Sequence, residues 1–445
     1  MFCELVLNSY VLGKYMLMKS LLEEAGVVSS WQEFYTYKTE HQHLTKKEAA
    51  ELKDFMDRRA WLPLCDAWRA GQFPGQLPVK HIVNKEGSRK KRVVYSFAGD
   101  EGIFLKYLAW QLFRFDDHFM PNCYAFRRLV GVKDAIERIR KDQRIRAQYC
   151  LKVDVSDYFN SIDVEILLEK LLFVRERDEA VYELFARILR ENRVTENGHM
   201  VTELHGAMAG TPISPFLANV YLRDTDLYFY ERGITYFRYS DDILLFADSR
   251  EELEEYRKEL TEQLHVLKLR LNPEKVKVTA PGEPWDFLGF GYRDGKIDLS
   301  ENTIRKTKAR IRRRAEALRR WQREKGLVPE KAAIGLIHTM NRKFYGNPEG
   351  FVPVAPLAGA SRADGDAETG MADDFTWSRW FFPCLTTDAG LKEIDRYFQE
   401  YIRYTVTGRH YKGNYRIRYE MLKEWGYESL VSAYYHAKKS IQCNL

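Results

Sequence analysis

The chain has 445 residues, of which 45% are hydrophobic and 30% are charged, so it is long enough for two or three domains with a large core. Lys and Arg number 70 against 64 Asp and Glu, and this net charge of +6 is too small to identify a nucleic-acid-binding protein by itself. The six cysteines show no Cys-x-x-Cys spacing, which excludes a disulfide framework and a zinc site of the usual kind.

The amino-terminal residues are apolar but interrupted by Glu4, Lys14 and Lys19, which is not the pattern of a signal peptide. No run approaches the roughly eighteen apolar residues that a membrane span needs. We therefore expect a cytoplasmic protein that has no membrane contact.

Breaks in the pattern divide the chain. Residues 1–75 are predicted to be helical and end at a segment rich in Gly and Pro. Strand-like and helical segments then alternate as far as residue 291, which is typical of an α+β fold. A stretch rich in Gly, Ala, Pro and Asp near 346–378 predicts a flexible loop or linker. Helical spacing returns in 379–445.

Two segments place carboxylates beside apolar strands. Asp154 interrupts the short apolar strand Leu-Lys-Val-Asp-Val at 151–155. Asp241 and Asp242 lie between two apolar and aromatic runs within 236–246, a pattern that predicts a hairpin with a tight turn. Pairing of the first strand beside this hairpin would bring the three acids together.

Carboxylates at the edge of a core are costly unless a cation offsets their desolvation and mutual repulsion. Protonated acids and a bound metal are the two explanations, and three hard oxygen donors favour Mg²⁺. Two Mg²⁺ ions, with Mn²⁺ as a substitute, can align an attacking hydroxyl and a leaving phosphate oxygen for in-line displacement.

These segments, taken with others in order, resemble the reverse transcriptases, specifically the bacterial group of retron, group II intron-like and defence-associated (abortive-infection-type) enzymes. The resemblance covers about residues 80–291. The segments that carry it lie at 84–92, 122–127, 151–159, 205–215, 236–246, 269–275 and 287–290.

The resemblance implies a right-hand polymerase in the α+β class, with fingers and palm followed by a helical thumb. The implied parts are an N-terminal helical extension (1–75), fingers and palm (76–299), basic thumb helices (300–345), a linker (346–378) and a C-terminal helical part of the thumb (379–445).

It also implies site residues. Asp154, Asp241 and Asp242, with the backbone carbonyl of Val155, correspond to the metal ligands, and Lys275 corresponds to the palm lysine that donates a proton to pyrophosphate. The implied nucleotide-binding residues are Lys85 and Arg92 for the triphosphate, Phe159 as the ring that excludes a 2′-hydroxyl, and Gly210 for close backbone approach.

The segment 206–210 departs from the family pattern. Relatives usually have a proline and a glutamine where this chain has Met208 and Ala209. The glutamine amide helps to position the templating base, and a methyl group cannot replace its hydrogen bonds. The departure favours a specialised enzyme over a general-purpose polymerase.

Positive charge is concentrated just after the last motif. Residues 305–325 contain eleven Lys or Arg against two acids, and apolar residues are spaced by seven on one face of the predicted helix. A solvated helical face and a phosphate-binding face both explain this pattern. The residues predicted to contact nucleic acid are Arg305, Lys308, Arg312, Arg313, Arg319 and Arg320.

The expected function is RNA-directed DNA polymerase activity that makes cDNA from dNTPs and a dedicated non-coding RNA template in bacterial antiphage defence. Three alternatives stay open: untemplated or protein-primed DNA synthesis, RNA-templated RNA synthesis, and a non-catalytic RNA-binding scaffold with a polymerase fold. For protein priming, the tail offers Tyr404, Tyr411, Tyr415 and Tyr419. A homo-oligomer and an accessory defence protein are both compatible with the sequence.

Overall fold

The computed structural model describes residues 19–41, 44–84, 91–346 and 376–443. The chain folds as two compact units. One consists of Met1–Gly131 and Leu151–Lys277, and the other of Val132–Cys150 and Val278–Leu445. The boundaries expected from sequence do not coincide with these units, and most of the expected linker lies outside the described residues, so the five-part division stays a prediction.

Two sheets are built mainly from residues of the first unit. One has the strand order β2-β1-β4-β5, in which β1 pairs antiparallel with β2 and touches β4 in parallel at one residue. The other has the order β6-β7-β3-β8. The strands are β1 (Val79–Asn84), β2 (Lys91–Ser96), β3 (Tyr149–Asp154), β4 (Arg193–Glu196), β5 (His199–Thr202), β6 (Tyr236–Tyr239), β7 (Asp242–Ala247) and β8 (Lys277–Thr279).

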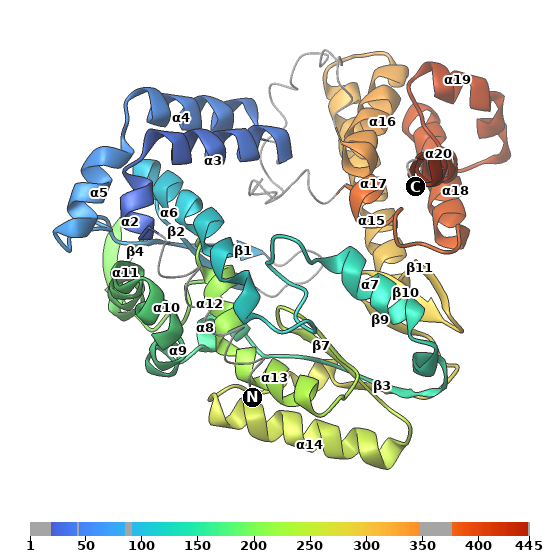
Figure 1. The fold of residues 1–445 in the computed structure, drawn as a ribbon. Coiled ribbons are helices and arrows are strands. Elements are labelled where there is room, and N and C mark those ends of the chain that lie inside the picture. The colour runs from blue at the N-terminus through green and yellow to red at the C-terminus, as the bar shows by residue number, and fades with distance from the viewer. Residues whose placement is uncertain (1–18, 42–43, 85–90, 347–375, 444–445) are drawn as a thin grey trace. The chain divides into compact units, whose positions relative to one another are not determined.

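Helices surround these sheets (Figure 1). They are α2 (Leu21–Ala25), α3 (Val28–His41), α4 (Lys46–Asp57), α5 (Trp61–Arg69), α6 (Gly99–Gln111), α8 (Tyr158–Ser161), α9 (Val164–Lys170), α10 (Leu172–Arg177), α11 (Glu179–Arg190), α12 (Ser214–Tyr221), α13 (Arg223–Glu231) and α14 (Arg250–Val266), with short 3₁₀ turns at Leu112–His118 and Pro273–Lys275.

An aromatic cluster holds the amino-terminal helices on α6. The ring of Trp31 stacks on Tyr107 at a centroid distance of 4.1 Å and on Trp61 at 5.4 Å. All three side chains are buried. Because aromatic rings bury large apolar areas and attract one another in offset or edge-on arrangements, this cluster fixes α3 and α5 against α6.

The second unit contains a three-stranded antiparallel sheet in the order β11-β10-β9 and a helical bundle in which α15, α16 and α18 pack on one another. Its elements are α7 (Val132–Lys141), a 3₁₀ turn (Gln143–Ala147), β9 (Trp285–Phe287), β10 (Phe290–Arg293), β11 (Lys296–Leu299), α15 (Glu301–Glu324), α16 (Pro329–Tyr345), α17 (Trp377–Trp380), α18 (Ala389–Thr407), a 3₁₀ turn (Lys412–Arg416), α19 (Tyr419–Glu424) and α20 (Leu430–Cys443).

The mixture of helices with mainly antiparallel sheets confirms the α+β class. In the part of the chain that the structure describes, none of the helices combines the length and the apolar character needed to span a bilayer.

Candidate active site

The hairpin expected around the paired acids is present. Tyr239 on β6 pairs with Asp242 on β7, so the connecting loop consists of Ser240 and Asp241 alone. Ser240 adopts a φ of +62°, a left-handed conformation that two-residue hairpin turns require at one or both central positions. The apolar residues of β7 that follow, from Ile243 onwards, are buried. The turn therefore carries both carboxylates at the edge of the core, as predicted.

Strand β3 lies beside this hairpin. The amide of Val155, the residue after Asp154, donates a hydrogen bond of 3.2 Å to the carbonyl oxygen of Asp241. On the other side, the amide of Asn272 donates to the carbonyl oxygen of Asp154 at 2.8 Å. The end of β3 is thus held from both sides, next to the turn. The predicted proximity of the strand-end acid to the acid pair is confirmed by these backbone contacts.

The carboxylates are close enough to influence one another. Burial, followed by repulsion from Asp154, raises the pKa of Asp241. Burial, followed by repulsion from Asp241, raises the pKa of Asp242 to about 6, and Asp154 adds to the effect. Arg92 and Lys275 oppose the shift at Asp241. Negative charge at this position is therefore costly to the folded protein unless a cation offsets it.

Lys275 already supplies part of that offset. Its ammonium group forms an ion pair with the carboxylate of Asp154, whose side chain is 8% exposed. The lysine belongs to the 3₁₀ turn after α14, where Asn272 accepts a hydrogen bond from the amide of Glu274. The expected palm lysine therefore lies at the acid cluster.

The residues have the chemistry of a divalent-cation site, because carboxylate and carbonyl oxygens suit Mg²⁺. The carbonyl oxygen of Val155 accepts no hydrogen bond from the described residues and could serve as a further donor. Among those same residues, no group of three or more His, Cys, Asp or Glu side chains is arranged as a metal site. Metal binding by Asp154, Asp241 and Asp242 therefore stays a prediction.

Three aromatic rings line the surface next to the turn. Phe159 lies beside Phe126, with ring centroids 6.4 Å apart and an interplanar angle of 70°, and Phe126 lies 6.3 Å from Tyr239. The guanidinium of Arg92 lies 5.9 Å from the centre of the Phe159 ring. The expected ring and the expected arginine are thus neighbours. Lys85, the other residue expected to hold the triphosphate, lies outside the described residues.

The segment between Gly206 and Gly210 is packed from both sides. The amide of Tyr95 on β2 donates to the carbonyl oxygen of Ala209 at 2.7 Å, and the amide of Ala207 donates to that of Phe159 at 2.8 Å. Gly210 has a φ of +98°, and a Cβ there would lie 3.0 Å from the Tyr95 carbonyl oxygen. The close approach at Gly210 is therefore to the protein's own strand β2.

Sequence reasoning missed the residues beneath the turn. Arg238, two residues before Ser240, is fully buried and forms an ion pair with the equally buried Asp226 of α13. Phe126 was also missed as a neighbour of Phe159. A charged residue inside the apolar run Tyr-Phe-Arg-Tyr was the one available signal for Arg238, because a lone charge in a buried strand requires a partner.

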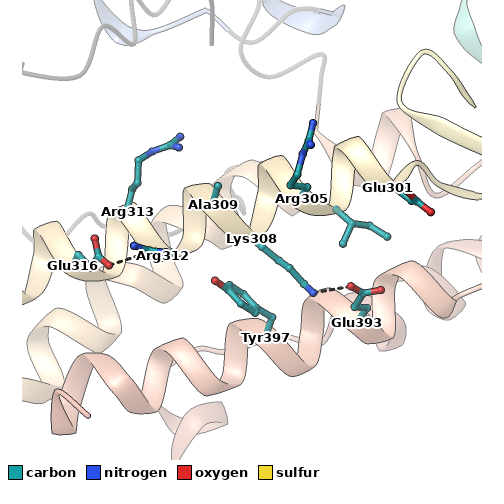
Figure 2. Close-up of a pocket in the computed structure, with 10 residues that line it drawn as sticks. Glu301, Arg305, Lys308, Ala309, Arg312, Arg313, Glu316, Glu393 and Tyr397 are labelled. Atoms are coloured by element: carbon teal, nitrogen blue, oxygen red, sulfur yellow. Dashed lines mark hydrogen bonds and ion pairs between the residues drawn. The ribbon is translucent and has the colours of Figure 1, made fainter. Parts of the chain in front are cut away.

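The second unit carries the basic helix. Half of the residues expected to contact nucleic acid are engaged within the protein, and Figure 2 shows the contacts of two of them, Lys308 and Arg312. The three contacts are Lys308 with Glu393 at 2.6 Å, Arg312 with Glu316 at 3.0 Å, and the guanidinium of Arg319 at 5.5 Å from the centre of the Tyr404 ring.

The other half is available. Arg305, Arg313 and Arg320 are exposed and form no ion pair within the described residues, and Arg305 donates one hydrogen bond of 2.9 Å to Asn302 Oδ1. Figure 2 shows Arg305 and Arg313 extending away from α18 at the margin of a groove of about 770 Å³. Among the described residues, the helix thus has a side whose cations contact acids or a ring of the protein and a basic side without ion pairs, which the sequence alone did not separate.

Comparison with known proteins finds a family match over the region that holds the acid cluster. Residues 83–292 match the family described as reverse transcriptase (RNA-dependent DNA polymerase). Protein YkfC of Escherichia coli strain K12 is 24% identical over 213 residues, which cover 39% of this chain and 55% of that protein. The chain therefore spans about half the length of this curated relative.

Two solved structures of apo telomerase from Candida tropicalis are similar at 10% sequence identity. One has a TM-score of 0.45 and covers 83% of this chain and 65% of the telomerase chain. The other, truncated from its C-terminal domain, has a TM-score of 0.40 and covers 50% and 55%. The family match shows that residues 83–292 are similar to reverse transcriptases, in agreement with the expected polymerase fold, and it assigns no template, primer or partner.

Proposed function

We propose that the chain is an RNA-directed DNA polymerase that synthesises cDNA from a dedicated non-coding RNA. The observation that carries this proposal is the backbone bond between Val155 and Asp241, because it brings Asp154 next to the acid turn within the region of the family match. The substituted position Ala209 supports a specialised template use, and antiphage defence is the cellular role that we propose for such an enzyme.

In this proposal Asp154, Asp241, Asp242 and the Val155 carbonyl would hold two Mg²⁺ ions, with Mn²⁺ as a substitute. Ions bound there would neutralise charge on the phosphates and activate the primer hydroxyl. The raised pKa values of Asp241 and Asp242 support a cation-binding site, because a cation offsets the repulsion between two partly buried carboxylates.

The protein's own groups then orient the substrates. Arg92, held beside the Phe159 ring, binds the triphosphate through its planar fork of donors. The Phe159 ring excludes a 2′-hydroxyl and so favours deoxynucleotides. Lys275 holds a proton on Nζ next to Asp154 and gives it to the departing pyrophosphate. Arg305, Arg313 and Arg320 bind the phosphates of the nucleic acid.

The test is incorporation of labelled dNTPs on the RNA that copurifies with the protein, identified by sequencing. The wild-type chain should extend a primer, whereas Asp241→Ala/Asp242→Ala should lose activity by at least about 1,000-fold, as expected when charge stabilisation in the transition state is removed. Equal incorporation by both proteins would contradict the proposal.

The same assay separates the alternatives. A product whose gel mobility changes on protease digestion would support protein priming, and a cellular phenotype that survives the double substitution would support a scaffold. Preference for NTPs over dNTPs would indicate RNA synthesis.

A further inference from the structure

The buried guanidinium of Arg238 lies directly beneath the acid turn. Its side chain is 0% exposed, and so is that of its ion-pair partner Asp226. Its Nε donates to Asp226 at 2.7 Å, and one Nη1 hydrogen bond of 3.3 Å reaches the carbonyl oxygen of Ser240. Arg238 therefore connects α13 to the first residue of the turn.

Every N–H donor of this guanidinium has an acceptor. The five acceptors are Asp226 Oδ1 and Oδ2, Asn219 Oδ1 at 3.2 Å, the Ser240 carbonyl oxygen and Cys123 Sγ at 3.1 Å. They come from α13, α12, the turn and the segment before α7. A planar group with five fixed donors fits this arrangement, and an ammonium with three donors cannot satisfy it.

Further bonds tie the same network to the chain around it. The amide of Arg238 donates to the carbonyl oxygen of Asn122, and the amide of Tyr124 donates to that of Arg238, both at 2.9 Å. The Tyr236 hydroxyl donates to Asp226 at 3.0 Å. The position of Arg238 is thus determined on both its backbone and its side chain.

The network contacts the acid turn through the hydrogen bond from Arg238 to the Ser240 carbonyl oxygen. This oxygen belongs to the peptide plane that joins Ser240 to Asp241, and Ser240 has the unfavourable φ of +62°. A strained residue of this kind persists only when its surroundings fix it. The bond from Arg238 fixes this plane and with it the direction in which Asp241 leaves the backbone.

A buried ion pair is a weak source of stability, because desolvation offsets most of the attraction between the charges, and similar-sized apolar residues are often as stable. Stability alone therefore does not explain this ion pair, and we look for its role in the geometry of the turn. We propose that Arg238 is a positioning residue that holds the Ser240–Asp241 peptide plane in the orientation needed for polymerisation. This inference rests on the proposed function of the site.

The test uses a double substitution, Arg238→Met/Asp226→Leu, which removes both buried charges and leaves neither unpaired. It is compared with Arg238→Lys and with Leu260→Ala, a variant that removes buried volume from α14, which packs on β7, without touching the network. Thermal melting, hydrogen exchange of the peptide covering 236–246, and kcat and KM for dNTP are measured on the full chain.

We expect the double variant to stay folded and to exchange the turn amides at least tenfold faster than wild type. Its kcat should fall about 100-fold, the loss typical of a misplaced reacting group, with KM changed less than threefold. Arg238→Lys should retain only part of the wild-type kcat, because the three donors of a lysine cannot bond to all five acceptors. Leu260→Ala should melt earlier but keep wild-type kcat and wild-type exchange in the turn.

Wild-type exchange in the turn of the folded double variant would overturn the inference, and so would wild-type kcat. If the double variant does not fold, Arg238→Lys with wild-type exchange and kcat would overturn it. Hydrogen exchange needs no polymerase activity, so failure of the proposed function would show as inactive wild-type protein, whereas failure of this inference would show as an unaltered turn.

Discussion

The amide of Val155 and the carbonyl oxygen of Asp241 are joined by a hydrogen bond of 3.2 Å, although 86 positions of sequence separate the two residues (241 − 155). The bond brings a strand end and a hairpin turn into one edge of a sheet, so that three carboxylates share a small region. The three carboxylates repel one another in the folded chain. Removing one of these charges should therefore change the free energy of unfolding measurably.

Asp242→Asn should stabilise the protein while it abolishes incorporation. Burial, Asp241 and Asp154 raise the pKa of Asp242 to about 6, so the ionised form present at pH 7.5 disfavours the folded state. A neutral amide removes a cost of about 3 kcal/mol, and the melting temperature in EDTA should rise.

Mg²⁺ should reduce this difference in stability between the variant and the wild type. A cation that binds only the folded wild type stabilises it by about 1.4 kcal/mol at tenfold excess over the dissociation constant, and the variant should gain less. Equal Mg²⁺ shifts in the two proteins would contradict metal binding by Asp242. Asp248→Asn, on the exposed residue after β7, is the control substitution.

Phe159→Ala should weaken discrimination against ribonucleotides. Loss of the ring opens space for a 2′-hydroxyl, and a steric contact of this type accounts for roughly 10- to 100-fold in relative kcat/KM. The ratio of dNTP to NTP incorporation on one template measures the effect. Unchanged discrimination would remove Phe159 from this role.

Phe126 should contribute through its contact with Phe159. Phe126→Leu removes an edge-to-face neighbour, so the Phe159 ring gains freedom and discrimination should fall by about threefold. Phe115→Leu, on a buried ring that contacts Phe173 and Phe216 instead, should leave the ratio unchanged.

Local pattern was sufficient to predict the hairpin and its neighbouring strand. Alternation of apolar residues around Asp241 and the apolar run around Asp154 specify strands, and a two-residue loop leaves one pairing register. Contacts between distant segments could not be predicted in this way. Arg238 and Asp226 form their pair through the packing of β6 on α13, and Lys275 reaches Asp154 across 121 positions.

The basic helix shows the same limit. Sequence identified α15 as a cationic helix with an apolar seam of Ile304, Ile311 and Leu318. The structure buries Ile311 and Leu318 and leaves Ile304 partly exposed. Which cations are free depends on α18, whose Glu393 and Tyr404 engage Lys308 and Arg319. No periodicity in α15 itself contains this information.

The two sides of α15 should therefore differ in their effect on nucleic-acid binding. Alanine at Arg305, Arg313 and Arg320 should weaken RNA binding and reduce the magnitude of the slope of log K against log salt concentration by about 2. The slope falls because the variant contacts fewer phosphates, so fewer counterions are released when RNA binds. Fluorescence anisotropy between 50 and 300 mM salt measures both quantities.

Alanine at Lys308, Arg312 and Arg319 is the matched charge control. These side chains already have partners within the protein, so their loss should alter the melting temperature more than the salt slope. Equal salt slopes for the two triple variants would contradict the difference between these two sides of the helix.

His118 should make the first unit sensitive to acid. Its ring lies 4.3 Å from that of Phe173, and burial, together with the positive charges of Arg177 and Arg223, lowers its pKa to about 4 against the opposing effect of Asp117. An unfolded histidine titrates near 6.5, so between pH 6.5 and 4 the unfolded chain binds more protons than the folded chain. The stability contributed by neutral His118 is complete above pH 6.5 and is lost as the pH falls towards 4.

His118→Phe keeps an aromatic ring against Phe173 and removes both the titration and the buried Nε2, which has no hydrogen-bond partner in the described structure. From pH 7 to pH 4.5, the wild type should lose about 2 kcal/mol more unfolding free energy than this variant. Urea denaturation at the two pH values measures the difference. His265→Phe, on an exposed histidine of α14, is the control and should behave as wild type. If His118→Phe lost as much unfolding free energy between pH 7 and pH 4.5 as the wild type, other groups would be the cause of the acid sensitivity.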